Sequence, residues 1–216
     1  MTGTHHPLRN RVTPDGDIVA VPERGLFFGN RGVLHDEERN VRRAWQVRRW
    51  ITCRLRFRGR RRPLMQPRRY TELFFLDEAT ALAAGHRPCA ECRYHDYQWF
   101  RAAWAAAQGG GLLPADDLDR VLHAERVTPE RAKRVHETPV ADLPDGAMVR
   151  LDGAAWLVLG VELQAWTPGG YADRRSRPGR GAVTVLTPPS TVAALRAGYE
   201  PVLHSTSAQS REMPTS

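Results

Sequence analysis

Residues 70–92 read YTELFFLDEATALAAGHRPCAEC and end in two cysteines, Cys89 and Cys92, which are separated by two residues and follow Pro88 directly. This spacing allows both sulfurs to reach one tetrahedral metal ion at the start of a helix, and zinc is the ion that such a pair most often binds. The alternative is that both cysteines pack as small apolar side chains without a metal. Two of the chain's three cysteines lie in this stretch, so their role restricts the class of protein to which the chain can belong.

The same stretch predicts a short strand followed by two helices. The apolar run at 73–76 indicates a buried strand. Asp77 is suited to cap a helix over 78–84, and Gly85 is suited to the position after its end. A second helix is expected from about residue 89 to residue 108, where three consecutive glycines end it.

Residues 45–57 alternate between apolar and polar side chains, which predicts a strand with one buried face. Cys53, the third cysteine, lies on the apolar face and could be either a metal ligand or a small buried hydrophobe. Trp50 breaks the alternation and falls on the arginine-rich face. There it would either stack on a nucleic-acid base or pack at the rim of the fold, and packing at the rim is the more common role.

Positive charge is concentrated beside this predicted strand. The formal net charge is +8 and the pI is about 10.2, with 31 arginines and one lysine, a bias partly expected of a GC-rich bacterial genome. Residues 41–70 hold twelve arginines and no Asp or Glu. Such a one-signed segment is typical of proteins that bind nucleic acid or phosphate. A solvated basic face, or a site for an acidic protein partner, would give the same pattern.

The rest of the chain divides by composition into further parts. Residues 1–17 are expected to form a flexible arm, and residues 109–137 a helical connector with helices over 116–126 and 129–136. The clustered aspartates at 116, 117 and 119 would complement the dipole of the first of these helices. The pattern from 138 to 204 predicts a small β module with strands at 148–151, 155–164 and 182–186. Residues 205–216 are polar and are expected to be disordered.

Several classes of protein are not expected from this sequence. No apolar run approaches the roughly 18 residues that a membrane span needs, and the first residues lack the apolar segment of a signal peptide. Three cysteines do not make a disulfide scaffold, so we expect a reduced, cytoplasmic setting. The chain also lacks a Walker loop, a GxGxxG motif and a GxSxG motif.

Residues 49–92 resemble the zinc-binding module of Ada-type DNA repair proteins, which take a methyl group from methylphosphotriesters in DNA. Residues 83–92, AAGHRPCAEC, are similar to the pattern AAG-[FY]-RPC-x2-C that ends that module. Cys53 corresponds to the first of two cysteines on the module's strand, and Phe57 occupies the position of the second. The resemblance covers about a fifth of the chain, and its second half is the more specific.

The resemblance implies a zinc cofactor, DNA contacts from the basic loop, and Cys53 as a possible methyl acceptor. With at most three thiolates the site would be less negative than in the family, and Cys53 would be less nucleophilic. The candidates for a fourth ligand are His35 and His95, followed by His86, with water or an aspartate as further alternatives. Each of these histidines, taken alone, is more often a surface or hydrogen-bonded residue.

The sequence therefore predicts an α+β protein, in which residues 18–108 form an Ada-like zinc module with an N-terminal β extension and residues 138–204 form a small β-barrel-like module. The expected function is binding of DNA or RNA through the phosphate backbone, with no membrane contact. The metal ligands would be Cys53, Cys89, Cys92 and His35. The nucleic-acid contacts would come from Arg54, Arg56, Arg58, Arg60, Arg61 and Arg62, with Trp50 as a further candidate. The alternatives are a methyl acceptor or zinc-dependent enzyme acting on nucleic acid, and a protein-interaction module.

Overall fold

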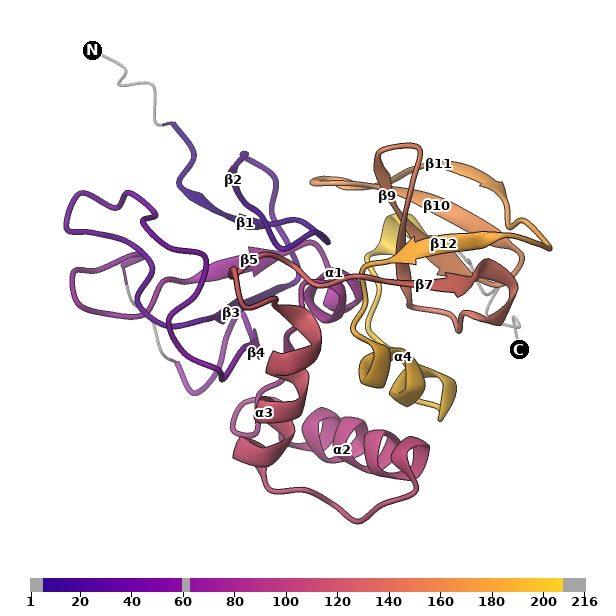
Figure 1. Cartoon of the computed structure of the whole chain (residues 1–216). Coiled ribbons are helices and arrows are strands. Elements are labelled where there is room, and N and C mark those ends of the chain that lie inside the picture. Colours follow the sequence, from indigo (N-terminus) through magenta and orange to yellow (C-terminus); the bar gives the residue numbers. More distant parts are fainter. Residues whose placement is uncertain (1–5, 60–62, 208–216) are drawn as a thin grey trace, which may run out of the picture.

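The computed structural model describes residues 6–59 and 63–207, which fold into two six-stranded sheets and four α-helices (Figure 1). This arrangement confirms the expected α+β class. Among the described residues, no helix is both long enough and apolar enough to cross a membrane.

The first sheet has the strand order β2-β1-β5-β3-β4-β6. Its strands are β1 (Arg9–Val12), β2 (Ile18–Ala20), β3 (Phe27–Asn30), β4 (Ile51–Arg54), β5 (Leu73–Phe75) and β6 (Arg87–Pro88). The predicted flexible arm is therefore wrong for residues 9–12, because β1 pairs with β2 on one side and with β5 on the other. This pairing could not be seen locally, since the strand contains two arginines and its partner β5 lies more than sixty positions away.

The long strand predicted over 45–57 is also wrong, since only the four residues of β4 belong to the sheet. Trp50, just before β4, is 3% exposed, so it does not lie on an arginine-rich surface. The guanidinium carbons of Arg31 and Arg126 lie 4.3 and 4.2 Å from the centre of its ring. Cation–π contacts with two arginines from distant parts of the chain therefore hold Trp50 inside the protein, although the local alternation predicted it on the arginine-rich face.

Helix α1 (Glu78–Ala83) lies between the two sheets, and all six of its residues are buried. As predicted, Asp77 caps it by accepting a hydrogen bond from the Thr80 amide at 2.9 Å, and Gly85 follows with a positive φ of 89°. Ala81 packs against the first sheet and Ala79 against the second. Alanines on two sides of the helix therefore supply apolar surface to both sheets.

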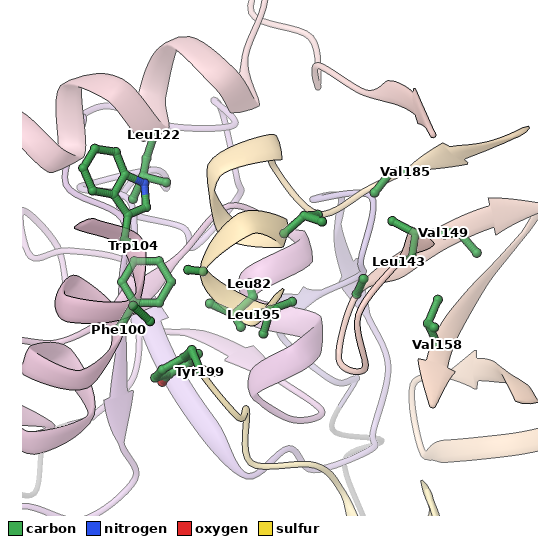
Figure 2. Packing of buried hydrophobic residues seen from close by; sticks show 14 of the residues in the cluster. Leu82, Phe100, Trp104, Leu122, Leu143, Val149, Val158, Val185, Leu195 and Tyr199 are labelled. Carbon is green, nitrogen blue, oxygen red and sulfur yellow. The ribbon is translucent and has the colours of Figure 1, made fainter. Parts of the chain in front are cut away.

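Three more helices complete the main core. They are α2 (Tyr94–Gln108), α3 (Ala115–Arg126) and α4 (Pro189–Arg196). Figure 2 shows Phe100 and Trp104 of α2 near Leu122 of α3 and Leu195 of α4. The helix predicted at 129–136 is wrong, because the chain turns there, with Arg131 at a φ of 69°, and enters strand β7 (His136–Pro139).

The second sheet has the order β11-β10-β9-β8-β12-β7. Its remaining strands are β8 (Met148–Leu151), β9 (Ala154–Leu159), β10 (Glu162–Thr167), β11 (Gly170–Ser176) and β12 (Ala182–Val185). The single strand expected at 155–164 is two strands of a hairpin, which turns at Gly160. The sheet is open, with β11 and β7 as its edges, so within the described residues there is no closed barrel.

Buried polar groups connect α1 to the C-terminal half. The Asp77 carboxylate accepts hydrogen bonds from the Tyr171 hydroxyl at 2.8 Å and from the His204 amide at 3.1 Å. Glu78 accepts one from the Tyr199 hydroxyl at 2.6 Å. The expected disorder after 204 is wrong for residues 205–207, which form a short 3₁₀ turn (Ser205–Ser207); the remainder of that predicted tail lies outside the described residues.

Candidate metal centre

The three cysteines come together, with sulfur atoms all within 4.8 Å of one another. Cys53 lies on β4, and Cys89 and Cys92 lie in the turn that follows β6. Parallel pairing of β4 with β6 brings these segments together, and the Cys89 amide donates to the Thr52 carbonyl at 2.9 Å. Three thiolates at this separation could hold a metal ion, because zinc–sulfur bonds of about 2.3 Å place the sulfurs roughly 4 Å apart.

Hydrogen bonds among the thiols divide the protons unequally. Donation from Cys53 and from Cys92 lowers the pKa of Cys89 to about 2, against the effect of burial. Interaction with the neighbouring sulfurs, chiefly that of Cys89, together with burial, raises the pKa of Cys53 far above its usual range. Among the three sulfurs, Cys89 is therefore the one whose deprotonation the cluster favours. A bound metal ion would replace the remaining thiol protons.

Two buried ion pairs hold the cysteine turn in place. Arg87, directly before Pro88, forms a two-point ion pair with Asp119 of α3 at 2.9 and 2.7 Å. Arg93, directly after Cys92, pairs with Glu78 at 2.8 Å. All four side chains are at most 3% exposed, so Asp119 is a buried partner and not the helix-dipole residue that its position suggested.

None of the three candidate histidines joins the cysteines. The ring nitrogens of His35 contact the Thr71 hydroxyl at 2.6 Å and the Gln66 carbonyl at 3.2 Å, so His35 has a different environment from the one predicted for a fourth ligand. His86 is buried between Trp50 and Phe75, and His95 is exposed on α2. Phe57, at the position where the resemblance to Ada-type modules would place another cysteine, packs against the three cysteines.

A pocket of about 760 Å³ opens onto the three cysteines. Its wall is formed mainly by β3, β4 and the segment that follows β4. Six of its lining residues are half-buried aromatic or aliphatic residues: Phe28, Ile51, Phe57, Leu64, Tyr70 and Phe74. Two carboxylates, Glu72 and Glu91, also line it, and Glu72 accepts a hydrogen bond from the Met65 amide at 2.8 Å.

Three of the predicted nucleic-acid contacts lie on this pocket. Arg54, Arg56 and Arg58 line it and are exposed, and within residues 6–59 and 63–207 none of them forms an ion pair. The other three, Arg60, Arg61 and Arg62, lie outside the described residues. Phe28, Phe74 and Tyr70 were not predicted as pocket residues. The apolar runs that contain Phe28 and Phe74 show no alternation that would place either ring on an exposed face, and only the burial pattern of β3 and β5 does so.

No protein-family model matches the chain, and neither the curated proteins nor the solved structures contain a significant match.

Proposed function

We propose that this chain is a zinc-containing protein that binds nucleic acid through the phosphate backbone. The observation that carries the proposal is the convergence of three cysteines and three exposed arginines on one pocket. The resemblance of residues 49–92 to Ada-type modules agrees with it.

The donor set favours zinc among common metals. Thiolates are soft ligands, which favour zinc or Cu(I) over magnesium or calcium. Zinc would bind Cys53, Cys89 and Cys92, and it would join β4 to the turn after β6, two segments more than thirty residues apart in the chain. The role of the metal is then structural, since loss of the ion leaves three buried sulfurs facing each other without a shared ligand.

The arginines supply the contacts to phosphate. Arg54, Arg56 and Arg58 alternate along β4 and the residues after it, and no carboxylate among the described residues pairs with them. Because each phosphate contact releases counterions, three contacts give a slope of log K against log salt of about −2 to −3. Glu91 at the same pocket opposes anion binding and reduces the net attraction.

The first experiment measures zinc per chain by elemental analysis. Cys53→Ala and Cys89→Ala should each lose the metal, whereas His35→Ala should keep it, because His35 is hydrogen-bonded elsewhere. A stably folded wild type without zinc would contradict the metal assignment.

The second experiment measures binding of a fluorescent DNA by anisotropy at several salt concentrations. Replacing Arg54, Arg56 and Arg58 together by Gln should weaken binding and reduce the salt slope. The matched control replaces three exposed arginines that do not line the pocket and so removes the same charge: Arg120, Arg134 and Arg196. Equal losses in the two triple variants would mean that only net charge matters, and binding to an acidic polypeptide but to no nucleic acid would favour the protein-interaction alternative.

A second candidate function follows from the missing fourth ligand. Within the described part of the chain no His, Cys, Asp or Glu joins the three cysteines, so a bound metal would have one position facing the pocket. Open positions are typical of catalytic zinc, and the Ada-type role of Cys53 as methyl acceptor also requires access from this side. The test is peptide mass spectrometry after exposure to DNA carrying methylphosphotriesters. A mass increase of about 14 Da on Cys53, the net gain when a methyl group replaces the thiol proton, would favour this alternative.

A further inference from the structure

The two faces of the first sheet differ in what they contact. One face packs against α1 through residues that include Phe27 of β3 and Phe75 of β5. The next residues along the same strands, Phe28 and Phe74, point to the other face because side chains alternate along a strand. Both are only partly buried, and both line the pocket beside the cysteines.

Strand register places these rings in one row. Arg11 of β1 pairs with Phe74, Phe74 pairs with Phe28, and Phe28 pairs with Cys53. Directly paired residues lie on the same face of a sheet. The two ring centres are 6.4 Å apart, and the Arg11 guanidinium carbon lies 4.9 Å from the Phe74 ring centre. The row therefore consists of a cation, two aromatic rings and a thiol.

This surface exceeds what phosphate binding needs. A backbone-binding site requires cations and amide donors, whereas four aromatic rings and three aliphatic side chains also line this pocket. Its volume of about 760 Å³ is in the range that holds a flat organic ligand. Arg54 and Arg56 line the same pocket and could bind the phosphates on either side of such a ligand.

We propose that the pocket takes an unpaired base of a single-stranded nucleic acid, which packs against the rings of Phe28 and Phe74, tilted by 46° to each other, while the arginines contact its flanking phosphates. Aromatic rings on a sheet face beside cations are the features with which proteins bind single strands. A base within a duplex has both faces covered by its neighbours and cannot enter the pocket unless it is extruded. This inference rests on the proposed nucleic-acid function and specifies which form of nucleic acid is bound.

The test compares three fluorescein-labelled oligonucleotides by anisotropy with the full chain: a 12-nucleotide single strand, a duplex of the same sequence, and a 12-nucleotide strand with four central abasic positions. We expect the single strand to bind at least tenfold more tightly than the duplex and the abasic strand. The abasic strand keeps the phosphates, so this difference measures the contribution of the bases.

Two substitutions locate the effect. Phe28→Leu and Phe74→Leu keep an apolar side chain, and each should weaken single-strand binding about fivefold or more without changing duplex binding. Trp99→Leu is the matched control, because Trp99 is an exposed aromatic residue on α2 that does not line the pocket. Circular dichroism and the melting temperature of each variant establish that it is folded.

The outcomes separate this inference from the proposed function. Equal affinity for all three oligonucleotides, with salt-sensitive binding that depends on Arg54 and Arg56, would overturn base insertion and leave backbone binding intact. Unchanged single-strand affinity in folded Phe28→Leu and Phe74→Leu would also overturn base insertion. Absence of binding to any oligonucleotide at low salt would overturn both.

Discussion

Replacing Asp119 by Ala should be among the most destabilising single changes in this protein. Asp119 forms two hydrogen bonds to Arg87, at 2.9 and 2.7 Å, and the two side chains are 3% and 2% exposed. Removing the carboxylate leaves a buried guanidinium that keeps only the Pro88 carbonyl at 2.9 Å and the Tyr97 ring at 4.9 Å. An unpaired buried charge of this kind costs roughly 3–5 kcal/mol.

A second cation adds to the cost. Burial lowers the pKa of Arg126 to about 9, and the negative charge of Asp119 is the strongest attraction that opposes this shift. Asp119→Ala therefore removes a compensating negative charge from two buried guanidinium groups, whereas Arg87→Met removes one cation. We expect Arg87→Met to be less destabilising than Asp119→Ala, and the double variant Arg87→Met/Asp119→Leu to recover only part of the loss.

The assay is urea denaturation followed by tryptophan fluorescence and by circular dichroism, whose coincidence tests two-state behaviour. Asp116→Ala is the control on the same helix, because Asp116 is 80% exposed and its ion pair with Arg49 measures 3.4 Å. That change should stay within about 0.5 kcal/mol of wild type. If Asp119→Ala costs no more than Asp116→Ala, the reasoning about the buried ion pair is refuted.

Three further predictions concern other parts of the molecule. Phe57→Cys should increase zinc affinity at least about tenfold in competition with a chromophoric chelator, since Phe57 packs on the cysteines, and unchanged affinity would mean that residue 57 cannot reach the ion. Burial lowers the pKa of Lys133 to about 7, so between pH 7 and 8.5 the folded state loses this proton while the unfolded state keeps it. The free energy of unfolding, measured by urea denaturation, should therefore rise by about 1–2 kcal/mol over this range in wild type and should not rise in Lys133→Met. A Cβ at Gly29 would lie 2.0 Å from the Ile51 carbonyl oxygen, so Gly29→Ala should lower stability by about 2 kcal/mol or more, whereas Gly110→Ala, with no atom within 4 Å, should leave the melting temperature unchanged or higher.

Local chemistry explains which elements could be predicted. The Asp77 cap, the helix after it and the turn at Gly85 depend on residues within one short segment, and the structure has them as expected. The strand predicted at 148–151 and the helix predicted at 116–126 correspond to β8 and α3, since both follow from local sequence patterns. The approach of Cys89 to Cys92 is equally local, because two intervening residues leave the sulfurs little freedom.

The contacts of Trp50, Arg126 and residues 129–136 could not be predicted, because their partners lie far along the chain. Trp50 is buried by two arginines from segments on either side of it, and a sequence pattern cannot show which arginines will meet an aromatic ring. The segment 129–136 has a good helix start, yet a bridge between Val127 and Lys133 and the pairing of β7 with β12 replace the helix. Tertiary hydrogen bonds outweighed a weak local propensity there.

The arginines differ in burial, and the sequence does not show which of them are buried. The sequence by itself determined the excess of positive charge, the cysteine pair and the short elements that flank it. Only the tertiary structure decided that Arg31, Arg87, Arg93 and Arg126 are buried while Arg54, Arg56 and Arg58 are exposed beside the cysteines. The physical reason is that a guanidinium group is buried only where distant carboxylates, carbonyls or aromatic rings compensate its lost hydration, and the fold alone brings those partners together.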